Sequence, residues 1–383
     1  MFILVLGSVL GLMTFYVWFR AIRDTTGPGR LRALLTVALL ALTALLAVTL
    51  VVPRVTGIEE LSWLAWPGYL WFGLLIYLVL ALLVFEPVWL VGWLRRRRAA
   101  PSDQRPTLDR RQFLARAGAV AAGATAVGVT GVGVATALGP PDVLRVPVRL
   151  GRLDPTFDGF RIAVVSDIHL GPLLGRAHTE RIVRMINDTE PDLVAVVGDL
   201  VDGTVEQLGS AAAPLADLVS REGTFFVTGN HEYFVDGTAE WLRELERLGL
   251  HVLRNEHTRI RRAGAAFDLA GVNDIAGRSR SDPPDFDRAL RGVDPLTATV
   301  LLAHQPVQVT EAAKRHVDLQ LSGHTHGGQM WPFHYAVELA QPSLAGLSTV
   351  DDTQLYVTRG AGFWGPPLRV GARPDISVLT LRS

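Results

Sequence analysis

Three long, almost unbroken apolar runs occupy most of the first hundred residues of this 383-residue chain. They extend over Met1 to Phe19, Ala33 to Val52, and Tyr69 to Leu94, where only Glu86 interrupts the run. Each run is near the ~20 residues that a helix needs to cross a bilayer. A long apolar run can also be a buried core helix, but three runs without a polar face favour membrane spans. We therefore expect three transmembrane helices within residues 1–98.

Arginines mark the ends of these runs and predict their orientation. They stand between the first two runs at Arg20, Arg23, Arg30 and Arg32, and after the third at Arg95, Arg96, Arg97 and Arg98. The segment 53–68 holds only Arg54, with Glu59 and Glu60. Because cytoplasmic loops carry the excess of arginine, the arginine-rich loops are predicted to be cytoplasmic and the first residue outside.

A fourth, weaker apolar segment covers 113–138 and is mostly Ala, Gly, Val and Thr. The stretch before it, Asp109-Arg110-Arg111-Gln112-Phe113-Leu114, resembles a twin-arginine export signal, which makes the twin-arginine export machinery a candidate partner. The alternatives are an ordinary fourth helix or a flexible linker. As a fourth crossing, the segment places everything after about residue 140 outside. We expect an arginine-rich cytoplasmic loop and fourth helix over 99–140, and a separate domain over 141–383.

From residue 141 onward, short apolar strands rich in β-branched residues alternate with helix-like stretches. The expected strands are 161–166, 193–197, 224–227, 299–303 and 319–321, and the expected helices include 176–188 and 238–248. Continuous apolar strands that alternate with helices indicate a buried sheet with helices on its faces. The fold class expected for the whole chain is a multi-pass α-helical membrane region followed by an α/β domain.

Polar side chains with metal-binding chemistry follow five of these strands. They are Asp167 and His169, then Asp199, then Asn230 and His231, then His304, and lastly His324 and His326. Sites in such sheets lie beyond the carboxyl ends of the strands. Carboxylate and imidazole together favour Mn, Fe or Zn over Ca or Mg. The glycines around His324 and His326 let that backbone approach closely. The pattern predicts two adjacent divalent cations, with Mn favoured and Fe or Zn as alternatives.

Composition excludes several other classes of site. The chain has no cysteine, which rules out disulfides, thiolate catalysis and Cys-ligated zinc. Its formal net charge is zero, and no basic stripe is interleaved with aromatic residues. Nucleic acid is therefore not expected as a partner.

In order, these strand ends read DxH, GD, GNH, H and GHxH, and this signature resembles that of the calcineurin-like metallophosphoesterase superfamily. The resemblance covers roughly residues 160–381 and extends to a bacterial branch of membrane-attached or exported enzymes. It implies a two-sheet sandwich flanked by helices. It also implies that Asp167, His169 and His326 bind one metal, that Asn230, His304 and His324 bind the other, and that Asp199 bridges both.

In this scheme a metal-bound hydroxide attacks phosphorus at a dinuclear centre, and His231 is not a ligand. It stabilises the phosphoryl oxygens or protonates the leaving alkoxide. Three further residues have two interpretations each. Asp202 supports a metal ligand or belongs to a turn, Glu232 orients a ligand or is solvated, and Arg359 binds substrate phosphate or is a surface arginine. Aromatics at Trp331, Phe333, Phe363 and Trp364 are expected in the core by default, with substrate or bilayer contact as the alternative.

The resulting expectation is a metal-dependent phosphoric ester hydrolase in the cell membrane with its catalytic domain on the extracytoplasmic side. Its expected substrate is a phosphodiester or pyrophosphate, of a lipid or cell-envelope precursor. The alternatives are a phosphomonoesterase of the same superfamily, or a non-catalytic membrane sensing or binding module with the same fold. A non-catalytic module is expected to lack ligands or His231, and none is missing here.

Overall fold

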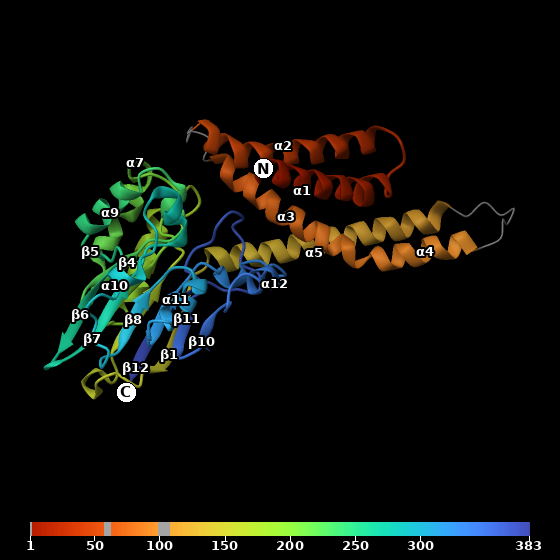
Figure 1. Ribbon diagram of the computed structural model, residues 1–383. Helices are drawn as coiled ribbons and strands as arrows, with labels where there is room; N and C mark the ends of the chain where they lie inside the picture. The colour runs from red at the N-terminus through yellow and green to blue at the C-terminus, as the bar shows by residue number, and fades with distance from the viewer. Residues whose placement is uncertain (1, 57–62, 99–107) are drawn as a thin grey trace. The chain divides into compact units, whose positions relative to one another are not determined.

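The computed structural model describes residues 2–56, 63–98 and 108–383, which form two compact units (Figure 1). One unit comprises Met1–Ala135 with Gly365–Leu368, and the other comprises Thr136–Trp364 with Arg369–Ser383. Parts of two predicted loops, 57–62 and 99–107, lie outside the described residues, as do the side chains of Arg110 and Arg111.

The first unit is helical. Its elements are α1 (Phe2–Val17), the π-helical η1 (Trp18–Arg23), α2 (Arg30–Thr56), α3 (Ala65–Val84), α4 (Glu86–Arg98) and α5 (Leu108–Leu138). Among the described residues, four stretches are long and apolar enough to cross a membrane: Val5–Arg23, Arg30–Val51, Ala65–Val84 and Gln112–Leu138. Many large apolar side chains on these helices stay exposed, including Leu34 at 67% and Val84 at 73%. Such surfaces suit contact with lipid.

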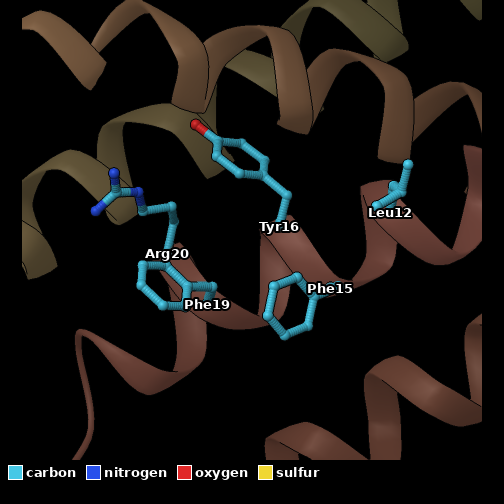
Figure 2. A pocket seen from close by; sticks show the side chains of 5 residues that line it. All are labelled: Leu12, Phe15, Tyr16, Phe19 and Arg20. Atoms are coloured by element: carbon cyan, nitrogen blue, oxygen red, sulfur yellow. The ribbon is translucent and has the colours of Figure 1, made fainter.

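The third apolar run does not form one continuous helix but divides into two helices. α3 ends at Val84 and α4 begins at Glu86. Pro87 has no N–H to donate to the carbonyl four residues earlier, so the α3 hydrogen-bond ladder cannot continue through it. The Glu86 carboxylate accepts from the Tyr16 hydroxyl at 2.7 Å and from Nε of Arg20 at 2.7 Å. Tyr16 and Arg20 also line a hollow of about 430 Å³ together with Leu12, Phe15 and Phe19. Figure 2 shows these five side chains.

The second unit holds two six-stranded sheets. The first has the order β1-β12-β2-β3-β4-β5 and the second β10-β11-β9-β8-β7-β6. The first sheet consists of β1 (Asp142–Arg149), β12 (Asp375–Arg382), β2 (Arg161–Val165), β3 (Leu193–Val197), β4 (Thr224–Val227) and β5 (Leu250–Val252). The second consists of β10 (Gly346–Val350), β11 (Thr353–Val357), β9 (Leu319–Ser322), β8 (Thr299–Leu302), β7 (Ala265–Gly271) and β6 (Glu256–Arg262).

Buried apolar side chains form two large cores in this unit. The core between the sheets joins Val164, Leu193 and Val197 of the first sheet to Phe267 and Leu302 of the second. The outer face of the first sheet is covered by α6 (Arg176–Asn187), α7 (Val205–Ala212) and α9 (Thr238–Arg247). Shorter helices complete the unit: α8 (His231–Phe234), α10 (Phe286–Ala289), α11 (Val309–Ala313) and α12 (His334–Glu338).

The predicted fold class is confirmed: four apolar helices precede a two-sheet α/β domain. The five expected strands appear within one residue of their predicted ends, because a run that is buried on both faces carries a strong sequence signal. Strands β2, β3 and β4 are mutually parallel, and so are β8 and β9. The loops after strands of one parallel set therefore leave at the same edge of each sheet.

Candidate metal centre

Six of the seven predicted metal ligands, all but Asn230, form three overlapping groups at the carboxyl ends of the strands, and His231 belongs to one of these groups. The groups are Asp167, His169 and His326, then His169, Asp199 and His231, and then Asp199, His304 and His324. Within each group the ligand atoms lie within 4.8 Å of one another. Because Asp199 belongs to two groups and His169 to two, the groups form one continuous cluster.

His304 shows that the cluster fits a cation. Its Nδ1 lies 2.8 Å from the carbonyl oxygen of Val197, which can only accept, so Nδ1 carries the ring proton of the neutral imidazole. Nε2, the ring nitrogen left to bind a cation, faces Oδ2 of Asp199 at 3.2 Å. Two lone pairs at this distance repel unless a cation or a proton lies between them. Oδ1 of Asn230, also buried, has no hydrogen-bond partner in the described chain, which fits an oxygen that binds a metal.

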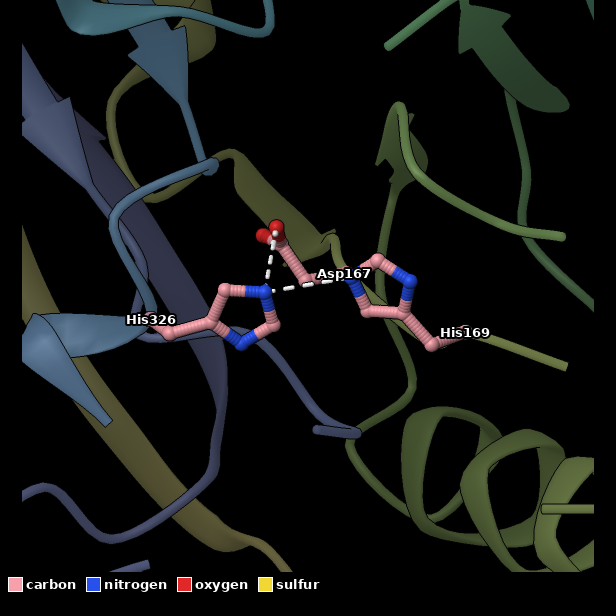
Figure 3. A group of neighbouring side chains, drawn as sticks. All are labelled: Asp167, His169 and His326. Atoms are coloured by element: carbon pink, nitrogen blue, oxygen red, sulfur yellow. Dashed lines mark hydrogen bonds and ion pairs between the residues drawn. The ribbon is translucent and has the colours of Figure 1, made fainter. Parts of the chain in front are cut away.

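The group formed by Asp167, His169 and His326 has the same character (Figure 3). Nε2 of His326 lies 3.1 Å from Nε2 of His169 and 3.4 Å from Oδ1 of Asp167. Burial, and then the nearby Arg369, hold the pKa of His326 well below its usual value. Burial also lowers the pKa of His324 to about 3. Both rings are therefore uncharged at neutral pH, the state in which imidazole binds a metal.

The backbone of the site is strained where the candidate ligands stand. Left-handed φ angles occur at Asp167 (52°), His169 (50°), Asp199 (52°), His324 (71°) and His326 (50°). For a residue other than glycine this conformation costs roughly 1–2 kcal/mol. Gly323 explains why one neighbouring position has no side chain: a Cβ there would lie 2.4 Å from Oδ2 of Asp167. The fold therefore positions these side chains against local backbone preference, as is typical of functional sites.

Asp202 joins two of the histidines. Its Oδ1 lies 3.0 Å from Nδ1 of His169 and 2.6 Å from Nδ1 of His231. Both Nδ1 atoms are thereby assigned as donors, which leaves each Nε2 directed at the cluster. Nε2 of His231 lies 4.0 Å from Oδ2 of Asp199. Burial opposes a charge on His231, but the Asp202 hydrogen bond and the two aspartates raise its pKa to about 9.

Glu232 lies beneath the cluster and is fully buried. Its carboxylate accepts from the backbone N–H groups of Gly229 at 2.6 Å, Leu200 at 2.7 Å and Asp199 at 3.0 Å. Burial and the Asp199 carboxylate raise the pKa of Glu232 to about 7, while these N–H donors favour its charged form. Glu232 thus ties the loop after β3 to the loop after β4, and both loops carry candidate ligands.

Glu232→Gln is expected to destabilise the protein by about 2–4 kcal/mol, since the amide NH₂ of glutamine would face backbone N–H groups. Thermal unfolding of the purified full chain, with the Glu240→Gln variant as a surface control, checks this. Equal melting temperatures for Glu232→Gln and the wild type would show that the contacts of this carboxylate contribute little.

Arg369 was missed at the sequence level and contacts a candidate ligand directly. The guanidinium is buried, Nη1 donates to the carbonyl oxygen of His326 at 2.7 Å, and Nη2 lies 3.1 Å from Nδ1 of that ring. No motif marks it, because it stands 43 residues after His326. Arg359, by contrast, lies 3.9 Å from Asp375, and its proposed contact with substrate phosphate stays a prediction.

The comparisons with known proteins agree with this geometry. The family model described as Calcineurin-like phosphoesterase matches residues 160–328. A zebrafish protein named "Transmembrane protein with metallophosphoesterase domain" is 33% identical over 100% of this chain and 89% of its own length. The chain belongs to the calcineurin-like metallophosphoesterase family. The predicted superfamily is thereby confirmed.

Relatives of this metallophosphoesterase occur in animals and bacteria. A bovine protein with the same name as the zebrafish one is 42% identical over 64% of this chain, which spans 58% of the bovine protein. An "Uncharacterized metallophosphoesterase" of Helicobacter pylori is 41% identical over 64% of this chain and 65% of its own length. The bacterial relative is consistent with the predicted bacterial branch, and the names of the animal relatives support membrane association.

Proposed function

We propose that this metallophosphoesterase hydrolyses a phosphodiester or pyrophosphate, with a lipid or cell-envelope precursor as the substrate. The observation that carries the proposal is the position of Asp199, which is shared between two groups of candidate ligands, with His231 beside them. A site of this kind can hold two cations, and the four apolar helices that the same chain carries support a membrane-linked substrate.

The first cation would be held by Asp167, His169 and His326, the second by Asn230, His304 and His324, and Asp199 would contact both. Mn is the favoured metal, with Fe or Zn as alternatives. When bound, two such cations activate the attacking water and neutralise phosphoryl charge. The hydrogen bonds of Asp202 and Val197 orient His169 and His304, because each fixes the proton on Nδ1 and leaves Nε2 free to bind.

His231 would act on the substrate itself. Asp202 holds its Nδ1, so Nε2 is the atom free to donate a proton to the leaving oxygen or a hydrogen bond to the phosphoryl group. The backbone N–H of His231 donates to Oδ1 of Asp199 at 2.8 Å, which fixes the position of this histidine relative to the candidate bridging carboxylate.

A substrate panel tests the proposed activity. The purified full chain, loaded in turn with Mn, Fe and Zn, is assayed against a phosphodiester, a phosphomonoester and a lipid pyrophosphate. We expect the diester or pyrophosphate to be hydrolysed fastest. Faster hydrolysis of the monoester would favour the alternative phosphomonoesterase. No hydrolysis of any of the three would support the non-catalytic sensing or binding module instead.

We further propose that the protein crosses the cell membrane several times and that its catalytic domain is extracytoplasmic. The arginine-rich loops support a cytoplasmic position for the segments that follow the first and third spans, and the apolar stretch Gln112–Leu138 reverses the chain once more. Protease added to intact spheroplasts should therefore digest or release the domain. Full protection would place the domain in the cytoplasm.

The export route is a separate prediction. Replacing Arg110 and Arg111 with lysine should leave the catalytic domain inside, because the paired arginines are proposed as an export signal. Replacing Arg97 and Arg98 with lysine serves as the matched control, since it keeps the charge and leaves that pair intact. Unchanged export of the Arg110 and Arg111 variant would assign this segment to an ordinary fourth helix.

A further inference from the structure

Two exposed aromatic rings lie close to His231. The Phe234 ring centroid lies 5.3 Å from that of His231, and the Trp364 centroid lies 5.7 Å from it in an edge-on arrangement. Phe234 is 67% exposed and Trp364 is 48% exposed. These two rings lie against His231 and are also exposed to solvent. They form an apolar surface beside the candidate metal centre that could contact a ligand.

The position of Trp364 is set by the loop that carries His324 and His326. Nε2 of Gln329 donates to the carbonyl oxygen of Trp364 at 2.9 Å, and the N–H of Trp364 donates to Oε1 of Gln329 at 3.1 Å. Gln329 itself has a left-handed φ of 49°. This paired contact holds the backbone of Trp364 against the candidate metal loop.

The default expectation of a core position was wrong for most of the aromatics in these loops. Phe363 is buried, at 3% exposure, but Trp331 and Phe333 are 52% and 48% exposed. Trp331 donates its N–H to the carbonyl oxygen of Val370 at 2.9 Å, which ties the segment after the histidine loop to the segment after Trp364. Exposed tryptophan and phenylalanine rings in such loops are typical of surfaces that contact amphiphilic molecules.

The length of the chain between the last apolar helix and the catalytic domain limits what the site can reach. α5 ends at Leu138 and β1 begins at Asp142. The three residues between them span at most about 10 Å when fully extended. If α5 crosses the bilayer, β1 therefore begins close to the end of a membrane-spanning helix, and an amphiphile of that membrane is a substrate class that suits such a tether.

We propose that the substrate's leaving group carries an alkyl or acyl chain, and that Phe234 and Trp364 hold the part of this chain nearest the leaving oxygen. This inference rests on the proposed function. Water adds to phosphorus as the bond between that phosphorus and the leaving oxygen breaks; this is the ester oxygen of the lipid in a phosphodiester and the bridging oxygen of the lipid-bound phosphate in a pyrophosphate. The leaving oxygen takes the proton from Nε2 of His231, and the proton that the water gives up restores His231. The products are a free lipid alcohol, or lipid phosphate, and the phosphoryl product.

Alkylphosphonates of increasing chain length test this assignment by binding, without turnover. The full chain in nanodiscs, loaded with Mn²⁺, is titrated calorimetrically with methylphosphonate and pentylphosphonate. Full burial of a methylene raises affinity about fourfold and half burial about twofold. Pentylphosphonate has four more methylenes than methylphosphonate, and the exposed rings should bury them by about half. We therefore expect pentylphosphonate to bind about tenfold more tightly than methylphosphonate. The Phe234→Ser and Trp364→Ser double variant should reduce this ratio to about two or less.

Leu296→Ser is the matched control, because Leu296 is 83% exposed and precedes β8, at the opposite end of that strand from His304. It should keep the tenfold ratio. A wild-type ratio near one, or a ratio that survives in the double variant, would overturn the assignment of these two rings. Failure of methylphosphonate to bind the Mn²⁺-loaded wild type would instead overturn the proposed phosphoesterase site, and this inference with it.

Discussion

Asp199→Asn should lower phosphoester hydrolysis by about a thousandfold or more, the largest effect expected of any single substitution in this chain. Oδ2 of Asp199 lies 3.2 Å from Nε2 of His304 and 3.9 Å from Nε2 of His169, so this one carboxylate serves both proposed metal positions. Two cations contribute several kcal/mol of charge stabilisation in the transition state, which corresponds to about three orders of magnitude in rate. Steady-state kinetics with a phosphodiester measure the loss.

Metal content gives this prediction a second readout. The wild type should retain two equivalents after gel filtration, and Asp199→Asn should retain one or none, because an amide is a weaker ligand than a carboxylate. Asp236→Asn is the matched control, since that side chain is 91% exposed and lies on the surface. Two tightly bound equivalents in Asp199→Asn would show that this residue does not bridge the metals.

His231→Ala should lower turnover by about 10²–10⁴-fold while leaving both metal equivalents in place. General acid help or stabilisation of the phosphoryl oxygens is typically worth this much. Nδ1 of His231 forms a 2.6 Å hydrogen bond with Oδ1 of Asp202. We therefore assign Nε2 of His231 to the substrate and not to a cation. Parallel measurement of kcat and of metal content tests both parts of the prediction. His251→Ala is a suitable control because it removes an exposed histidine from β5.

The alternative role of His231 is that of a metal ligand, and two distances support it. Nε2 of His231 lies 4.0 Å from Oδ2 of Asp199, and His231 forms one of the candidate groups together with His169 and Asp199. Loss of one full metal equivalent in His231→Ala would make this histidine a ligand. Intact metal content together with unchanged kcat would remove it from the mechanism.

The sequence predicted most of the α/β fold and the candidate ligand set for a common physical reason. Strands that are buried on both faces are continuous apolar runs, and the polar residues that follow them stand out against that background. The same contrast revealed Asp167, Asp199 and His304. The apolar runs therefore predicted the strands, and the polar residues after these runs predicted which side chains would meet at one edge of the sheets. The structure brings these side chains together.

Other features depended on contacts that no local pattern encodes. Arg369 contacts His326 from 43 residues away in sequence. Asp202 was interpreted as a supporting or a turn residue, but its single oxygen joins His169 to His231, which only the tertiary structure reveals. Trp331 and Trp364 were expected in the core but are exposed. The burial preference of large aromatic residues is an average over many proteins and does not predict the position of a particular ring.

Reactivation by metal titration tests the central claim most directly. The purified full chain, stripped with a chelator, is titrated with Mn²⁺ while hydrolysis of a phosphodiester and the binding of Mn²⁺ are followed together. The two-cation account predicts no hydrolysis in the stripped protein and full activity only when two equivalents per chain are bound. Full activity with one bound equivalent, or hydrolysis that continues without any divalent metal, would contradict it.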